Sequence, residues 1–192
     1  MLLRTHIRHP LTDLTLFATI DKQSKPVLKG ILFGIHKKWR GRASRLVEGP
    51  FPQLRGLRRS LSGFLDGKAK SLRDVPLDVT GFTNFQKRVL QTARSIQWGN
   101  VVSYSDLARM SGRPAAVRAV ASVMRNNDFP LVVPCHRIVR KDGSIGGFMG
   151  KTKGKCVELK KRLLERETST RLPSTSLRNH GTLLLTKEKG RG

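Results

Sequence analysis

The stretch "SYSDLARMSGRPAAVRAVASVMRNN", residues 103–127, has the outline of a helix-turn-helix. A short helix is expected between Ser103 as its N-terminal cap and Gly112 as its stop. A longer helix follows, and Pro114 suits its first turn because a proline there gives up no helical hydrogen bond. Two helices joined by a tight glycine-containing turn are typical of domains that place the second helix in a DNA groove.

The second helix of this pair has two different faces. One face is apolar, and the other places small side chains beside positive charge. A small, positively charged face lets a helix backbone come close to a phosphodiester strand, although an ordinary solvated face is the alternative. The apolar stripe consists of Val117, Val120, Ala121 and Met124, and the opposite face of Ala115, Arg118, Ser122 and Arg125.

The overall charge favours the DNA-facing interpretation. Lys and Arg number 38 against 13 Asp and Glu, which gives a formal net charge of +25. A chain this basic is expected to bind a polyanion, most simply double-stranded DNA, because each neutralised phosphate releases condensed counterions. A basic surface that serves only solubility is the alternative.

Length and composition limit the other possibilities. A chain of 192 residues can form one core or two small lobes without disulfides. It has two cysteines, no signal-like opening segment, and no apolar run near the roughly 20 residues that span a bilayer. We therefore expect a soluble protein of the reducing cytoplasm, with no membrane partner.

The first third of the chain predicts strands followed by a helix. The runs "LTLFATI" (14–20) and "LKGILFG" (28–34) flank the polar turn "DKQSKP" and suggest an antiparallel pair. Residues 54–67 have apolar side chains at helical spacing, with Gly67 as a stop. An extended connector then leads to Thr83 and Gln86, which fit a capping box for a helix ending at Gly99. The predicted divisions are an N-terminal lobe (1–79), a second domain (80–167) and a basic, disordered tail (168–192).

The segment "VVPCHRIV" (132–139) places Cys135 beside His136 in an apolar run. Two cysteines without a CxxC or a histidine cluster cannot build a structural zinc site, so no metal is expected. The thiol is either a nucleophile or a buried core residue. Neighbouring side chains on an extended segment point to opposite faces. A nucleophilic role therefore requires a sharp bend or a water between thiol and imidazole, and a carboxylate elsewhere to orient the ring.

Downstream of this segment, the chain predicts a pocket wall and a last helix. Asp142 and Gly143 favour a hairpin turn, and the glycine-rich loop after them is expected to line a pocket. The run "KCVELKKRLLERE" has helical spacing. Its inward side chains are expected to be Val157, Leu159, Leu163 and Leu164.

Taken together, "PCHRIV", "SYSDLA", "RPAAVRAVASVMRNN" and "FQKRVL" closely resemble the O6-alkylguanine-DNA alkyltransferase family, from about Leu54 to Glu167. The resemblance implies a ribonuclease-H-like α/β N-terminal lobe and a mainly helical C-terminal lobe of winged helix-turn-helix character. It also implies a monomer that repairs double-stranded DNA without a cofactor. The alkyl group of O6-alkylguanine, with O4-alkylthymine as a further candidate, moves irreversibly to Cys135, and the protein is consumed.

The same resemblance implies roles for individual residues. His136 acts on Cys135 through a water and is held by Glu167, with Glu165 as the second choice. Tyr104 hydrogen-bonds the extruded guanine and crowds its phosphate, and Asn127 is the hinge between helix and site. Arg118 is the finger that fills the gap left by the flipped base, with Ala115, Ser122 and Arg125 as further DNA contacts. The pocket lining comprises Pro130, Ile138, Ile145, Gly146, Phe148 and Met149, within a loop that runs to Gly150.

Two departures from the family pattern stand out. Phe148 occupies a position where tyrosine is common, and Asp128 one where proline is usual, which puts rate and substrate range in question. Three other functions compete with repair. An alkyltransferase-like protein that binds damage without transfer usually has tryptophan in place of the cysteine, so Cys135 argues against it. A winged-helix regulator would use the same helices without chemistry, and a cysteine hydrolase would need an oxyanion site that the sequence does not identify.

Overall fold

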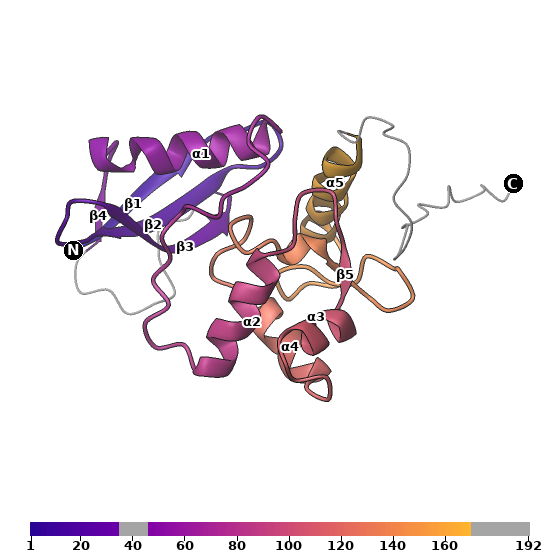
Figure 1. Ribbon diagram of the computed structural model, residues 1–192. Coiled ribbons are helices and arrows are strands. Elements are labelled where there is room, and N and C mark those ends of the chain that lie inside the picture. Colours follow the sequence, from indigo (N-terminus) through magenta and orange to yellow (C-terminus); the bar gives the residue numbers. More distant parts are fainter. Residues whose placement is uncertain (35–45, 170–192) are drawn as a thin grey trace, which may run out of the picture.

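The N-terminal lobe is a mixed four-stranded sheet covered on one face by a helix (Figure 1). The computed structural model describes residues 1–34 and 46–169. The strands are β1 (Leu2–Ile7), β2 (Leu14–Ile20), β3 (Pro26–Phe33) and β4 (Leu46–Glu48), in the order β3-β2-β1-β4. The predicted pairing of residues 14–20 with 28–34 is confirmed, because β2 and β3 are antiparallel. Neither β1 nor the three-residue β4 was predicted; β4 pairs in parallel with β1, a partner far away in sequence.

The predicted helix after the sheet is present. A short 3-10 turn, η1 (Pro52–Leu54), leads into α1 (Arg55–Leu65). The helix buries Leu57, Leu61 and Phe64 in the core that it shares with the sheet. Gly67 follows with φ +76°, a left-handed conformation that glycine adopts without strain and that lets the chain leave the helix.

The predicted capping box opens α2 (Asn84–Arg94): Gln86 N donates to Thr83 Oγ1, and Thr83 N donates to Gln86 Oε1. The expected end at Gly99 is wrong, because the helix stops at Arg94. Arg73, from the connector, donates its Nη2 to the Ser95 carbonyl and its Nε to that of Arg94. A side chain distant in sequence thus donates hydrogen bonds to the last carbonyls of the helix.

Two helices occupy the segment predicted as a helix-turn-helix: α3 (Tyr104–Met110) and α4 (Val117–Arg125), after the short strand β5 (Val102–Ser103). Ser103 caps α3, and Gly112 follows it with φ +71°. The expected start of the second helix at Pro114 is wrong: Ala116 N donates to the Arg113 carbonyl, so a separate turn precedes α4.

The rest of the chain carries the candidate site. The 3-10 turn η2 (Cys135–Arg137) runs into β6 (Ile138–Val139), which pairs in parallel with β5. The Asp142–Gly143 turn forms but closes no hairpin, because the partner of β6 is β5. The last helix, α5 (Lys155–Ser169), includes the first two residues of the predicted tail; residues 170–192 lie outside the described part. No described helix is long and apolar enough to cross a bilayer.

Candidate active site

The thiol of Cys135 lies at a sharp bend. Pro134 ends the extended run, Cys135 N donates to the Val133 carbonyl at 2.8 Å, and Arg137 N donates to the Pro134 carbonyl at 2.9 Å. The whole segment 131–139 is buried, and Cys135 is only 4% exposed. A bend was one of the two arrangements that a nucleophilic role required.

Asn127 connects the end of α4 to this bend. Its Nδ2 donates to Cys135 Sγ at 3.2 Å and to the Val133 carbonyl at 3.0 Å, while its Oδ1 accepts from Phe129 N at 3.0 Å. Because all three groups are buried, these bonds fix the amide orientation and aim a donor at the sulfur. A donor in this position stabilises a thiolate more than a thiol.

His136, Arg137 and Glu167 form a buried network beneath the bend. His136 Nε2 lies 2.8 Å from Glu167 Oε1, and Arg137 donates from Nε and Nη2 to the same carboxylate at 2.8 and 2.9 Å. Arg137 also donates to the Ile96 carbonyl at 2.6 Å, and its guanidinium carbon lies 5.8 Å from the ring of Phe64 in the N-terminal lobe. The network therefore joins η2 to α5 and to α1.

The carboxylate determines which histidine nitrogen carries the proton. Burial alone would raise the pKa of Glu167, but the hydrogen bonds and charges of His136 and Arg137 outweigh it and lower this pKa to about 2. The ionised carboxylate accepts, so His136 Nε2 is the donor and Nδ1 carries the lone pair. Burial lowers the pKa of His136, although the hydrogen bond and charge of Glu167 oppose this shift. The lowered pKa favours the neutral imidazole. Nδ1 is buried and has no hydrogen-bond partner among the described residues.

Lys160, on α5, is a component of the site that was not predicted. Its side chain is fully buried, and Nζ donates to the carbonyls of Ile138 at 2.5 Å and Gly147 at 3.2 Å. Burial lowers the pKa of Lys160 to about 8, and the nearby Cys135 opposes that shift. Burial raises the pKa of Cys135 in turn, opposed by the Asn127 hydrogen bond and the Lys160 charge. Lys160 therefore supplies positive charge to the thiol and also connects two backbone segments of the site.

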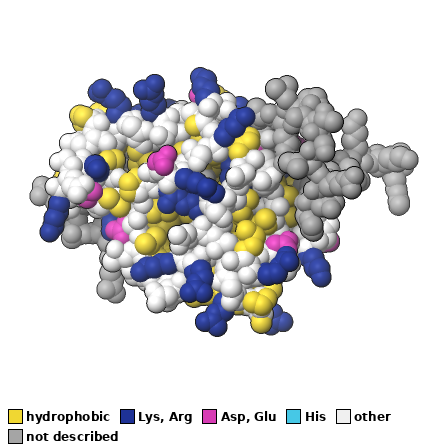
Figure 2. Space-filling model, viewed as in Figure 1, with side chains coloured by type: hydrophobic (Ala, Val, Ile, Leu, Met, Phe, Trp, Pro, Cys, Tyr) yellow, Lys and Arg dark blue, Asp and Glu magenta, His cyan; other side chains and the backbone are white. Residues whose placement is uncertain are grey.

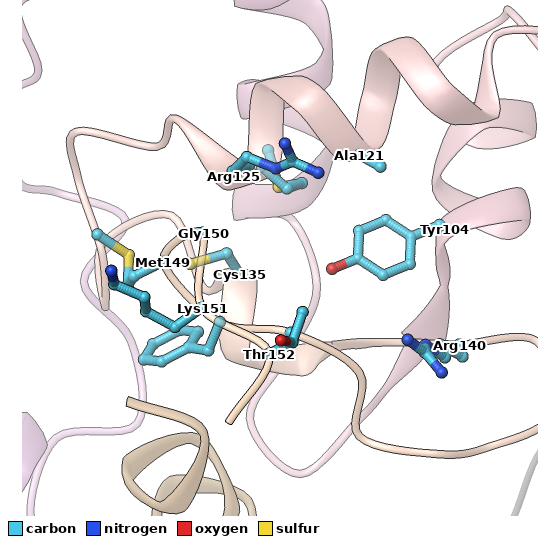
Figure 3. Close-up of a pocket in the computed structure, with 12 residues that line it drawn as sticks. Tyr104, Ala121, Arg125, Cys135, Arg140, Met149, Gly150, Lys151 and Thr152 are labelled. Carbon is cyan, nitrogen blue, oxygen red and sulfur yellow. The ribbon is translucent and has the colours of Figure 1, made fainter. Parts of the chain in front are cut away.

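A cavity of about 210 Å³ opens in front of the thiol (Figure 3). The hydroxyl of Tyr104 points across it toward the side where Cys135 lies (Figure 3). Burial raises the pKa of Tyr104, so the phenol is a neutral donor near pH 7. The lining consists of Tyr104, Ala121, Met124, Arg125, Cys135, Arg140, Gly147, Phe148, Met149, Gly150, Lys151 and Thr152.

The predicted pocket residues are only partly brought together. Phe148 and Met149 line the cavity, whereas Pro130, Ile138, Ile145 and Gly146 do not. Pro130 and Ile138 are buried, and of the predicted glycine-rich loop only the residues from Gly147 onward line the cavity. Among the described residues, no three His, Cys, Asp or Glu side chains lie close enough together to hold a metal ion.

The predicted DNA face of α4 is exposed. Val120 and Met124 are buried, while Arg118, Ser122 and Arg125 point outward, and Ala115 is exposed in the turn before the helix. Of the four residues predicted to contact DNA from this face, Arg125 lines the cavity, and Ala115, Arg118 and Ser122 do not. Lys and Arg side chains spread over the face seen in Figure 2, where Asp and Glu are few. The other cysteine, Cys156, is half-buried on α5 and does not line the cavity.

Comparison with known proteins gives a consistent result. The family described as "6-O-methylguanine DNA methyltransferase, DNA binding domain" matches residues 84–169. The methylated-DNA–protein-cysteine methyltransferase of Methanothermobacter thermautotrophicus is 37% identical over 161 residues, which cover 84% of this chain and 82% of the relative. The bifunctional transcriptional activator and DNA repair enzyme Ada of Escherichia coli is 45% identical over 93 residues, 48% of this chain but 25% of the relative.

A solved structure extends the similarity to the fold. The crystal structure of Mycobacterium tuberculosis OGT in complex with DNA matches with a TM-score of 0.72 and 29% identity. The match covers 87% of this chain and 93% of the solved one, so the similarity is not confined to one half of the molecule. The family match over residues 84–169 spans the segments that hold Asn127, Cys135, His136 and Glu167.

Proposed function

This chain belongs to the methylated-DNA–protein-cysteine methyltransferase family and repairs DNA by direct alkyl transfer to a cysteine; we propose that the acceptor is Cys135. The observation that carries this assignment is the contact between Asn127 Nδ2 and Cys135 Sγ at the cavity, above the His136–Glu167 pair. Cys156 has no comparable surroundings.

The proposed reaction transfers one alkyl group and balances without a co-reactant. The Cys135 sulfur attacks the carbon bound to O6, the new S–C bond forms as the C–O6 bond breaks, and the electron pair of that bond passes to guanine. His136 Nδ1 takes the thiol proton through a water, and guanine regains one proton as it leaves. Asn127 and Lys160 stabilise the sulfur anion before attack, and the Tyr104 hydroxyl donates to the extruded base.

The direct test is intact-mass analysis after mixing the protein with duplex DNA containing O6-methylguanine. We expect each molecule to gain one methyl group, located on Cys135 by peptide mapping, and none on Cys156. Unmodified protein in the presence of unrepaired DNA would favour the damage-binding or regulator functions, and multiple turnover would contradict the irreversible step.

We further propose that α3 and α4 belong to a winged helix-turn-helix that binds double-stranded DNA and extrudes the alkylated base. The exposed α4 face and the presence of Tyr104 in the cavity lining support this role. We also propose that the sheet lobe is ribonuclease-H-like and that the boundary between the two lobes lies near residue 80. We propose O4-alkylthymine as a second substrate. The protein is proposed to act as a monomer in the cytoplasm.

Arg118→Ala tests the extrusion step. If the Arg118 guanidinium fills the vacated stack, its loss should slow repair in duplex DNA by roughly 10- to 100-fold, because extrusion costs a few kcal/mol. The reaction with free O6-benzylguanine needs no extrusion and should keep its rate. Both rates are measured in one preparation, with Arg162→Ala on α5 as a control that removes the same charge from an exposed site. Equal slowing on both substrates would place Arg118 in the pocket structure and not in the stack.

A further inference from the structure

The N-terminal lobe reaches the cavity wall through an aromatic contact between Phe33 and Phe148. Phe33 is the last residue of β3, and its ring centroid lies 5.6 Å from that of Phe148, with the two planes tilted by 43°. Phe148 is 3% exposed and lines the cavity in front of Cys135. One ring of the pocket wall is therefore backed by a side chain that the second lobe does not supply.

The backbone that carries Phe148 is a tight turn. Phe148 N donates to the Lys151 carbonyl at 2.8 Å and Lys151 N donates back at 2.9 Å, with Met149 and Gly150 at φ +50° and +75°. Two positive φ values between the paired residues are the pattern of a type I′ turn. At Gly147, a Cβ would lie 2.9 Å from the Lys151 carbonyl oxygen, so no other residue fits without a shift. The turn fixes the backbone, but the ring of Phe148 is held by what packs against it.

The strand that carries Phe33 is itself anchored to the second half of the chain. Ile31 N donates to the Asp128 carbonyl at 2.8 Å, next to the residue that contacts the Cys135 sulfur. Leu28 exchanges two backbone hydrogen bonds of 2.8 Å with Pro76 and Asp78. Phe33 thus lies on a strand whose edge is hydrogen-bonded to other segments, so its ring is held in place against Phe148.

We propose that Phe33 is a positioning residue that determines which alkyl groups the pocket accepts. Because Phe33 packs against Phe148, it limits how far the Phe148 ring can move when a group larger than methyl is placed beside Cys135. The proposal rests on the proposed transfer to Cys135. Phe33 itself touches no substrate, since it is not part of the cavity lining.

Truncating Phe33 should widen the substrate range. With alanine at this position, the Phe148 ring gains space behind it, so a benzyl group meets less resistance while a methyl group gains no contact. We expect the ratio of the transfer rates for O6-benzylguanine and O6-methylguanine, each in the same duplex, to rise by roughly three- to tenfold. Phe33→Leu, which retains more volume, should give a smaller rise.

The matched control is Phe51→Ala, another half-buried phenylalanine of the N-terminal lobe that does not line the cavity. It should lower thermal stability without changing the ratio. The double variant Phe33→Ala/Phe148→Ala shows whether the effect passes through Phe148: the ratio should then equal that of Phe148→Ala alone. If Phe33→Ala fails to fold, Phe33→Leu and its own double variant with Phe148→Ala decide.

The outcomes separate this proposal from the function on which it rests. A ratio that Phe33→Ala and Phe33→Leu leave unchanged, with both substrates still reacting, would overturn the role of Phe33 and leave the transfer reaction intact. An equal rise in Phe51→Ala would show a general loosening of the lobe. If the unchanged protein transfers no alkyl group to Cys135, the proposed function fails first.

Discussion

Replacing Cys135 with alanine abolishes alkyl transfer while the affinity for duplex DNA stays the same. The substitution removes the sulfur that would form the new bond. The exposed residues of α4, which are expected to contact phosphates, lie outside the buried segment that carries Cys135. Transfer is measured by intact mass, and affinity by titration with undamaged duplex at a fixed salt concentration.

Cys156→Ala is the matched control for this prediction. Cys156 is half-buried near the start of α5 and does not line the cavity, so its loss should leave transfer at the original rate. Residual alkylation of Cys135→Ala would identify a second acceptor. A loss of DNA binding in the same variant would mean that the DNA surface is misplaced.

Glu167→Gln should both slow transfer and destabilise the fold. Glutamine keeps the size of the side chain but removes the charge that orients His136 and balances the buried Arg137. Breaking a buried ion pair by neutralising one partner lowers the free energy of unfolding by about 3–5 kcal/mol. A misoriented histidine should slow transfer by on the order of 100-fold or more. Denaturant unfolding and single-turnover rates at pH 7 measure the two effects.

The pH dependence of this destabilisation follows from the shifted pKa. In the folded protein the pKa of Glu167 is lowered from 4.5 to about 2, so its ionisation stabilises the fold by about 3 kcal/mol at neutral pH. That contribution is fully present above pH 4.5 and is lost as the pH falls toward 2. The stability difference between the original protein and Glu167→Gln should therefore shrink across this window.

Glu165→Gln is the internal control for that experiment. Glu165 lies on the same helix, two residues away, and was the second candidate for the carboxylate that orients His136. His136 Nε2 pairs with Glu167 and not with Glu165, which is half-buried, so the loss of the Glu165 charge should change neither stability nor transfer appreciably. A large effect of Glu165→Gln would contradict the assignment of Glu167.

The helix starts that depend on neighbouring residues could be predicted from the sequence. Thr83 and Ser103 cap their helices through groups three residues away, so a local pattern contains the whole signal. The end of α2 could not be predicted, because Arg73 takes up its last carbonyls from the connector. Strand β4 was missed for the same reason, since it pairs with β1, more than 40 residues earlier.

In the candidate site too, local sequence patterns identified some residues, whereas contacts between distant segments could not be predicted. The motif identified Cys135, His136 and Asn127, but only the folded chain brings the Asn127 amide to the sulfur. Lys160 was missed because a lysine suggests a solvated position. Its spacing to Leu163 and Leu164, three and four residues on, does place it on the buried face of α5, so helical periodicity could have found it. Arg140, Lys151 and Thr152 reach the cavity through loop geometry that no spacing predicts.

The covered edge of β3 has a consequence for how the two halves of the chain can be separated. An open strand edge is a template for pairing with another chain. In the described part of this sheet, β3 forms backbone hydrogen bonds with Pro76, Asp78 and Asp128. The strand at the opposite edge, β4, has three residues. A fragment ending at residue 79 would lose both the hydrogen bond from Ile31 N to the Asp128 carbonyl and the contact of Phe33 with Phe148. Such a fragment would self-associate through this edge, so the sheet lobe is not an independent module that could be moved to another protein.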